Sequence, residues 1–384
     1  MNSQPFTSAD LAAEFPVIER HSWLNHAAIS PWPTAVSRAM SSYVRANAER
    51  GPLDYGSWLQ LEQSLREKAA ALFGSDRADD VALVANTSTG LNRVARGLDW
   101  QHGDSVVFVE GDFPSNCLPW QRLASMGVNA RAVRLDPHDP ERSLIAALGP
   151  STRLLAVSSV HYESGLRLDL ARLGEACSRQ GVLFCIDAIQ QLGALPLDAP
   201  AVGADFVVAG SHKWLLAPEG LALFWSRPEA RALLEVVDPG WRMYPDPFAF
   251  ERDDAEAPAA ARRFEPGTLN TAGILGLEAA VSLLLDHGME VVGEALLDRT
   301  DMLTNALESV PGIWLVSPLQ RARRAGIVSL VLDGVSAEAA LARLTLNNIH
   351  AAVRGKCLRL SPHFYTPQEQ LEQTIVLLRE LANA

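Results

Sequence analysis

Seven short apolar runs, separated by helical segments, constrain the fold of this chain more than any other feature of its sequence. The runs are continuous stretches of aliphatic and aromatic residues, as in "FVVAG" at 206–210, and they do not alternate with polar residues. Strands buried on both faces of a parallel sheet have this composition. The alternation with helices predicts an α/β protein with a wound, mostly parallel seven-stranded sheet. The expected strands are 80–85, 104–110, 130–135, 153–160, 182–187, 205–210 and 221–225.

The pattern changes near residue 270. A helix is expected over 270–288, and shorter strands then alternate with two further helices. These strands are expected at 313–317, 326–332 and 357–361, and the helices at 336–348 and 367–384. The change indicates a small C-terminal α+β domain. We therefore expect an N-terminal segment (1–30) packed near the small domain and the active site, a large domain (31–270), and a linking helix with the small domain (271–384).

Charge and composition exclude several classes of protein. A net charge of −12 over 384 residues disfavours nucleic acid or an anionic membrane as the main partner. No apolar run reaches the ~20 residues of a membrane span, and the N-terminus has no signal-peptide pattern, so a cytoplasmic location is expected. The four cysteines show no CxxC spacing and the nine histidines no HxxxH or HExxH pair, so no metal site is expected. No GxGxxG motif follows the first strand, which argues against an NAD-binding enzyme.

Polar residues follow five of the expected strands at their carboxyl ends, where open parallel sheets bind ligands. The first of these strands runs into a helix through Thr87, Ser88 and Thr89. The hydroxyl and N–H groups of such a turn suit a phosphate group, although the same residues also serve as an ordinary helix N-cap.

A lysine and an aspartate end two further strands. Lys213 follows the 205–210 run, and a lysine at the edge of a dry pocket becomes a nucleophile toward an aldehyde. Alone it would equally suit a lysine that extends into solvent at a sheet edge. Asp187 ends a buried strand, where its carboxylate needs a cation such as a protonated pyridine nitrogen, or caps the next turn. Gln190 follows three residues later and could hydrogen-bond a ring hydroxyl.

The lysine motif is the most specific of five stretches that resemble one enzyme family. In chain order they are "NTSTGLNRVARGL", "CIDAIQQLG", "DFVVAGSHKWLLAPEGLALF", "RRFEPGTLNTAGILGLEAA" and "CLRLSPHFYTPQEQL". They resemble the class V aminotransferase group of fold-type I pyridoxal-phosphate (PLP) enzymes, which includes cysteine desulfurases, selenocysteine lyases, kynureninases and isopenicillin N epimerases. The resemblance covers most of the chain from about residue 20 to 375, in the family's order.

This resemblance implies roles for individual residues. Lys213 would form the Schiff base with the cofactor, Asp187 would pair with the pyridine nitrogen, and Gln190 would touch the ring oxygen. Arg359 would hold the substrate carboxylate as a bidentate fork, near Asn25 and His26. The family forms homodimers in which one segment reaches the neighbouring active site. The residues expected to hold the phosphate are Thr87, Ser88, Thr89, Ser211, His212 and, across the dimer interface, Thr268 of the partner subunit.

Two departures from the desulfurase pattern bear on the reaction. "EGDFPSN" places Phe113 where desulfurases often stack a histidine, so Phe113 is the expected stacking ring, as in the kynureninase-like branch. A desulfurase also needs a mobile thiolate. The corresponding region contains only Cys357, which shares a strand face with Arg359 but lies inside the strand, and this favours a buried structural role. Arg242 could recognise an acidic substrate side chain or form an ion pair.

We therefore expect a PLP-dependent enzyme that acts at Cα of a small amino-acid-like substrate. An aminotransferase or a carbon–sulfur or related lyase is favoured. The alternatives are an epimerase, a cysteine desulfurase or selenocysteine lyase, and a PLP-binding protein without catalysis. Only the last belongs to a different functional class, and the intact set of Lys213, Asp187 and Arg359 speaks against it.

Overall fold

The computed structural model describes residues 8–244, 246, 248, 249, 251 and 256–383. The expected N-terminal segment is therefore described from residue 8 onward, and the small domain as far as residue 383. Positions 1–7, 245, 247, 250, 252–255 and 384 of the three expected regions lie outside the described residues.

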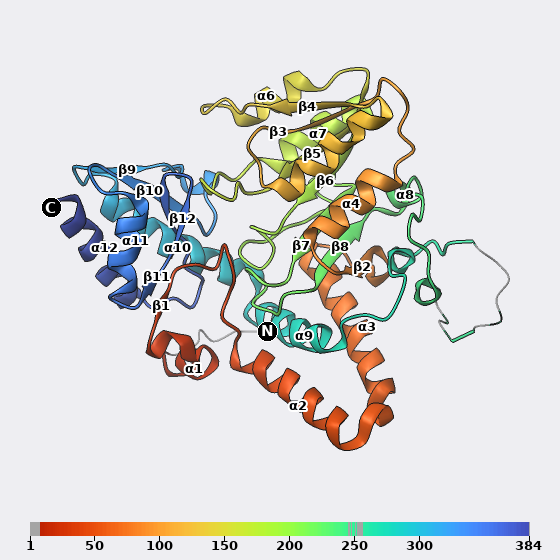
Figure 1. The fold of residues 1–384 in the computed structure, drawn as a ribbon, viewed down its shortest axis with the longest axis horizontal. Helices are drawn as coiled ribbons and strands as arrows, with labels where there is room; N and C mark the ends of the chain where they lie inside the picture. Colours follow the sequence, from red (N-terminus) through yellow and green to blue (C-terminus); the bar gives the residue numbers. More distant parts are fainter. Residues whose placement is uncertain (1–7, 245, 247, 250, 252–255, 384) are drawn as a thin grey trace.

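A seven-stranded sheet forms the centre of the large domain, in the order β2-β8-β7-β6-β5-β3-β4 (Figure 1). The five strands from β7 to β4 are mutually parallel, and β8 is antiparallel to both of its neighbours. The strands are β2 (Val81–Val84), β3 (Ser105–Val109), β4 (Asn129–Val133), β5 (Thr152–Ser158), β6 (Leu183–Asp187), β7 (Phe206–Gly210) and β8 (Ala222–Ser226). The expected α/β fold with a mostly parallel sheet is confirmed, because buried apolar runs locate such strands closely.

Helices cover both faces of this sheet, and a separate apolar core lies on each side. Alternate residues of one strand enter different cores: Leu155 of β5 packs in one and Leu154 in the other. The covering helices are α4 (Thr87–Gly97), α5 (Leu118–Arg122), α6 (Pro140–Ala147), α7 (Leu170–Gln180) and α8 (Pro228–Arg231). Burial on both faces explains why the inner strands are apolar, whereas the edge strand β4 is largely exposed and contains Asn129 and Arg131.

Three long helices pack together below the sheet in the view of Figure 1. They are α2 (Thr34–Arg50), α3 (Tyr55–Leu72) and α9 (Thr271–His287), and α9 contacts both of the others. The short α1 (Ser8–Glu14) precedes them. Among the described residues no single helix is long and apolar enough to cross a membrane. Only the pair of α9 and α10 (Met289–Leu307), with a bend of 84° between them, meets that criterion.

The small domain has its own four-stranded antiparallel sheet in the order β12-β13-β10-β9. Its strands are β9 (Ile313–Leu315), β10 (Val328–Leu332), β12 (Ala352–Arg354) and β13 (Cys357–Leu360), and its helices α10 (Met289–Leu307), α11 (Ala337–Thr345) and α12 (Gln368–Ala382). A third core fills the space between them and includes Leu24 from the N-terminal segment.

The N-terminal segment is attached to the small domain by a short parallel pairing. β1 (Ser22–Trp23) pairs with β11 (Ile349–His350), and Asn25 forms a further bridge with Ser361. The sequence did not predict β1, β11 or β12, because these strands of two or three residues do not lie within a longer apolar run, unlike the equally short β9. The 3₁₀ helices are η1 (Pro16–Glu19), η2 (Gly51–Asp54), η3 (Ala78–Asp80), η4 (Pro114–Asn116), η5 (Leu123–Met126), η6 (Trp241–Met243), η7 (Ala261–Phe264) and η8 (Arg321–Arg323).

Candidate active site

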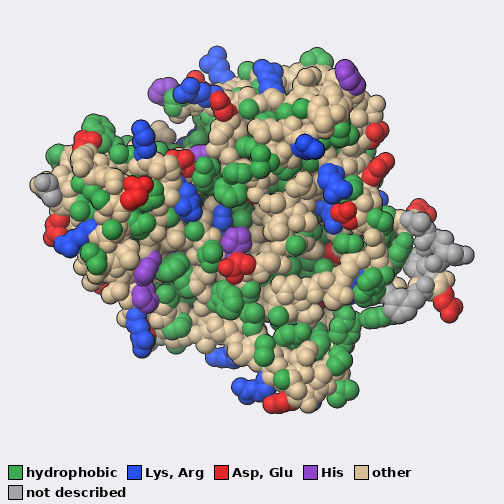
Figure 2. All heavy atoms as spheres, viewed as in Figure 1, with side chains coloured by type: hydrophobic (Ala, Val, Ile, Leu, Met, Phe, Trp, Pro, Cys, Tyr) green, Lys and Arg blue, Asp and Glu red, His purple; other side chains and the backbone are tan. Residues whose placement is uncertain are grey.

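A cavity of about 400 Å³ lies where the carboxyl ends of β2, β3, β5, β6 and β7 meet the small domain and the N-terminal segment. Figure 2 shows basic and histidine side chains gathered along the junction between the two domains. The parallel register places Asp187, the last residue of β6, beside Ser158 of β5 and Val208 of β7. The lining residues are Ala27, Ala28, Ile29, Asn86, Thr87, Ser88, Phe113, Ser115, Tyr162, Asp187, Ile189, Gln190, His212, Lys213, Arg354 and Arg359.

Lys213 enters this cavity from the turn after β7, and its side chain is almost fully buried. Its Nζ lies 5.5 Å from the centre of the Phe113 ring. Burial lowers the pKa of Lys213, and the carboxylate of Asp187 opposes this shift. The guanidinium groups of Arg359 and Arg354 lower the same pKa further. A lysine in this setting releases its proton readily and becomes a nucleophile.

Asp187 is only 1% exposed at the end of β6. Its Oδ1 accepts a hydrogen bond from the backbone N–H of Ile189 at 3.0 Å. Burial raises the pKa of this carboxyl group, and that hydrogen bond and Lys213 counter the shift. A cationic group in the cavity would therefore stabilise the ionised carboxylate.

The N-terminus of α4 forms one wall of the cavity. The Oγ1 atom of Thr87 is buried there without a hydrogen-bond partner, and the hydroxyls of Ser88 and Ser115 lie 2.7 Å apart. A Cβ atom on Gly210 would lie 3.1 Å from Thr87 Oγ1, so the glycine keeps this wall open. Unpartnered polar groups beside a helix N-terminus suit a phosphate group.

Two other residues expected to bind the phosphate, Thr89 and Ser211, use their hydroxyl groups in hydrogen bonds within the protein. Thr89 donates from its N–H and its hydroxyl to Oδ1 of Asn86, which is the N-cap of α4, and it lines a neighbouring cavity of about 390 Å³. The hydroxyl of Ser211 lies within hydrogen-bonding distance of the backbone carbonyls of Pro218 and Leu221, and Ser211 does not line the active-site cavity. The side chain of the α4 N-cap uses the Thr89 hydroxyl, and a backbone turn uses the Ser211 hydroxyl, so neither is free for the ligand in the way that was expected.

Thr268 is exposed and does not line the cavity of its own chain. Its expected contribution to the partner subunit's site stays a prediction.

Arg359 reaches the cavity from β13 in the small domain, and it is 1% exposed. One of its guanidinium nitrogens, Nη1, donates to the backbone carbonyl of Tyr162 at 2.6 Å. Its Nε and Nη2 atoms are buried without partners. A buried guanidinium group with free donors is costly unless an anion binds it, so a carboxylate ligand is the expected partner.

The remaining walls are aromatic and amide side chains. The rings of Phe113 and Tyr162 meet edge to face, 5.4 Å apart. Gln190 donates through Nε2 to the Ala27 carbonyl, and its Oε1 accepts from Nε1 of Trp214 at 2.7 Å. Gln190 therefore lies in the cavity wall with its amide held in one orientation.

The structure places Asn25 and His26 behind this wall and outside the lining of the cavity. His26 is fully buried, with Nδ1 2.8 Å from the Ser361 carbonyl and Nε2 2.7 Å from the Tyr365 hydroxyl. The next three residues, 27–29, line the cavity instead. The motif was located within a few residues, but the direction of its side chains was not evident from the sequence.

Several lining residues were not among the sequence candidates. Arg354 is the most consequential, because it adds a second guanidinium group near Arg359 and Lys213. It lies in a short strand before a glycine turn, a context that has no recognisable motif. The others are Ala27, Ala28, Ile29, Asn86, Ser115, Tyr162 and Ile189.

The sequence did not decide the roles of Arg242 and Cys357. Arg242 is buried and paired with Glu62, and it does not line the cavity, so it acts as an ion-pair partner inside the fold. Cys357 is buried in β13 beside Glu163, with Sγ 3.8 Å from Oε1. It also lies outside the cavity lining.

The family model described as "Aminotransferase class-V" matches residues 22–373. The chain belongs to the class-V aminotransferase family. This class-V aminotransferase is 29% identical to a probable cysteine desulfurase of Methanothermobacter thermautotrophicus over 97% of this chain and 98% of the relative. It is 30% identical to a cysteine desulfurase of Klebsiella pneumoniae, covering 82% and 81% of the two chains. A solved structure, the cystine C–S lyase C-DES in complex with cysteine persulfide, superimposes with a TM-score of 0.88 at 25% identity over 95% and 99% of the chains.

Enzymes of this family use PLP, and this class-V aminotransferase is a PLP-dependent enzyme. The residues of the cavity fit the cofactor. Thr87 offers a free hydroxyl for the phosphate, Asp187 a buried carboxylate for the pyridine nitrogen, and Lys213 a buried amine for the aldehyde.

Proposed function

We propose that this enzyme is a lyase that cleaves the C–S bond of a sulfur-containing amino acid without forming a persulfide on one of its own cysteines. The main support for this proposal is that none of the four cysteines, all of which lie among the described residues, lines the cavity. Burial raises the pKa of Cys357, and the carboxylate of Glu163 raises it further, so this thiol is a poor nucleophile. The similarity to a cystine C–S lyase supports the proposal.

The residues of the cavity can perform an elimination. PLP, when bound, supplies an electron sink for the negative charge that develops at the substrate Cα. Arg359 holds the substrate α-carboxylate through its free Nε and Nη2 donors. Nζ of Lys213 accepts the Cα proton, the C–S bond at Cβ breaks, and the sulfur leaves with the bonding electron pair and takes up a proton.

Arg354 indicates the shape of the substrate. It lies in the same cavity as Arg359, and both guanidinium groups lower the pKa of Lys213 by repulsion. Two guanidinium groups suit a substrate with two carboxylates. Cystine, a disulfide of two amino acids, has this property, whereas cysteine has one carboxylate.

Product analysis tests this proposal. We expect the purified PLP-loaded enzyme to convert L-cystine to pyruvate, ammonia and a sulfur-containing fragment. The matched variant Cys357→Ser should keep this activity. Loss of activity in Cys357→Ser would indicate a desulfurase. A keto acid that retains the substrate side chain would indicate an aminotransferase, and the D-amino acid an epimerase. Each of these three results would contradict the proposed lyase activity.

We also propose that the enzyme is a homodimer in which Thr268 reaches the phosphate of the partner subunit's site. Thr268 is exposed and lies outside its own cavity, which supports a role in a neighbouring chain. Light scattering should give twice the mass of one chain. Mixed dimers of Lys213→Ala and Thr268→Ala chains should contain one intact site and regain activity above either parent. A monomer, or no gain on mixing, would contradict the proposal.

A further inference from the structure

A second cavity, of about 570 Å³, lies behind the active site at the junction of the two domains. Its walls come from the segment before and at the start of α7 (167–171), from the loop after β6 (residues 191 and 196–198, with 202), and from residues 322 and 323 of the small domain. Gln190 lines the active-site cavity and the adjacent Gln191 lines this one. The two cavities are therefore separated by a single turn of chain.

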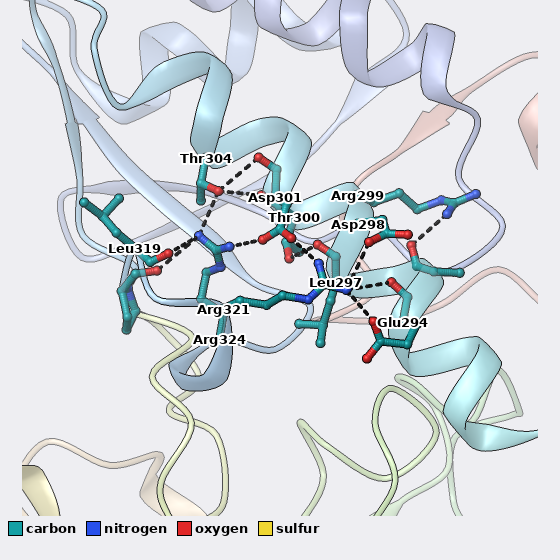
Figure 3. Close-up of polar contacts among 12 residues, drawn as sticks. Glu294, Leu297, Asp298, Arg299, Thr300, Asp301, Thr304, Leu319, Arg321 and Arg324 are labelled. Carbon is teal, nitrogen blue, oxygen red and sulfur yellow. Dashed lines mark hydrogen bonds and ion pairs between the residues drawn. The ribbon is translucent and has the colours of Figure 1, made fainter.

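The small-domain wall is held firmly. Arg321 forms ion pairs with Glu294 and Asp298 of α10, and Arg324 donates to Thr304 and to the Leu319 carbonyl (Figure 3). Between them, Arg323 makes a bidentate pair with the fully buried Glu141 of the large domain, at 2.5 and 2.9 Å. The cavity thus has fixed walls, and the charge of Arg323 is already neutralised.

Arg167 lines this cavity and has no ion-pair partner among the described residues. Its backbone N–H donates to the Arg323 carbonyl, but its half-buried guanidinium group makes no hydrogen bond or ion pair with any described residue. Burial lowers the pKa of Arg167, and Asp169 only partly opposes this. A half-buried, unpaired guanidinium group favours an anionic ligand.

The other polar groups of the cavity call for a hydrogen-bond donor. Gln191 is 2% exposed, and its Oε1 is buried without a partner while its Nε2 donates to the Pro196 carbonyl. Asp169 and Asp198 also line the cavity, and each uses one carboxylate oxygen to accept a backbone N–H. These groups favour an ammonium group and disfavour a simple anion.

We propose that this cavity binds a small zwitterion of the α-amino acid type, with its carboxylate at Arg167 and its ammonium group facing Gln191, Asp169 and Asp198. The site is separate from the active site and needs no covalent step. The ligand would contact both domains, because residues 322 and 323 close one side of the cavity.

Calorimetric titration of the PLP-loaded enzyme with 2-aminoisobutyrate tests this directly, since this amino acid lacks a Cα hydrogen and cannot lose one. We expect two binding events per chain, of which only the active-site event changes the cofactor absorbance. Arg167→Gln should weaken the spectrally silent event by about ten-fold or more and leave the other unchanged. Arg167→Lys should retain part of the binding, and Arg179→Gln, whose side chain pairs with Glu175 outside the cavity, should behave as the parent enzyme.

Three results would overturn the proposal. They are a single binding event in the parent enzyme, an unchanged silent event in Arg167→Gln, and equally tight binding of acetate, which would reveal an anion site instead. Circular dichroism and cofactor absorbance establish that each variant is folded. If Arg167→Gln does not fold, the titrations of the parent enzyme with 2-aminoisobutyrate and acetate, together with the titration of Arg167→Lys, still test the proposal.

Discussion

Ser30 donates a hydrogen bond from its hydroxyl to the backbone carbonyl of Lys213 at 2.5 Å, and its backbone N–H donates to the carbonyl of His212 at 2.9 Å. The N-terminal segment, which pairs with the small domain, thereby holds the backbone of the reactive lysine in the large domain. The position of the lysine depends on residues 183 positions apart in the chain.

Ser30→Ala should destabilise the enzyme and loosen the lysine. It leaves the buried Lys213 carbonyl without its side-chain partner, which costs about 1–3 kcal/mol of unfolding free energy. Urea unfolding and the rate of PLP release measure the two effects. Ser37→Ala, an exposed serine on the neighbouring helix, is the matched control and should change neither. Equal behaviour of the two variants would refute the role of Ser30.

The attachment of PLP to the apoenzyme should depend on pH in a way that reflects burial of Lys213. Burial holds the pKa of Lys213 below the 10.5 of an ordinary lysine. The neutral amine is the nucleophile, so the attachment rate should rise with pH and level off below pH 10.5. Stopped-flow absorbance follows the reaction. A rate that still rises through the pKa of free lysine would show that the site does not lower the pKa.

Arg359 and Arg354 should differ in their effects on two substrates. Arg359→Ala should raise the KM of every amino acid by about 100-fold or more, because it removes the carboxylate partner. Arg354→Ala should raise the KM of cystine by about ten-fold and leave that of cysteine nearly unchanged. Both variants should keep the cofactor absorbance. Parallel losses on cystine and cysteine in Arg354→Ala would contradict a second carboxylate contact.

The fully buried His26 predicts a loss of stability in acid. Burial lowers the pKa of His26 from 6.5 to about 4, so the unfolded chain binds a proton in this range that the folded chain does not. The stability is full above pH 6.5 and falls by about 3 kcal/mol as the pH drops to 4. Burial shifts the pKa of His363 in the same direction.

The Tm measured between pH 7.5 and 4 tests the role of His26. His26→Asn should flatten part of the acid decline, whereas His138→Asn, at an exposed site, should leave the decline unchanged. An equally steep decline in His26→Asn would assign the acid sensitivity to other groups.

The sequence located the central sheet closely but missed the shortest strands. β2 to β8 each fall within about two residues of an expected run, and for all of them except the exposed edge strand β4 the reason is that a buried strand requires an apolar segment. β1 and β11 have two residues each and form only through pairing between distant parts of the chain, which periodicity does not reveal.

The same distinction applies to the active site. Lys213, Asp187 and Arg359 lie together in the cavity because they end or occupy regular strands, whose direction the sheet determines. Arg354 was missed because a lone arginine beside a turn carries no local signal. His26 and Ser211 were assigned to the ligand, but the Ser361 carbonyl and the Tyr365 hydroxyl satisfy the ring of His26, and carbonyls of a nearby turn satisfy Ser211. Such partners are set by tertiary contacts.

The most direct test of the account is to reduce the PLP-loaded enzyme with borohydride and to map the modified lysine by peptide mass spectrometry. We expect the cofactor on Lys213 alone, and a Lys213→Ala variant with no reducible cofactor bond. Substantial labelling of Lys68 or Lys356, or an unchanged reducible bond in Lys213→Ala, would contradict the assignment of the active site.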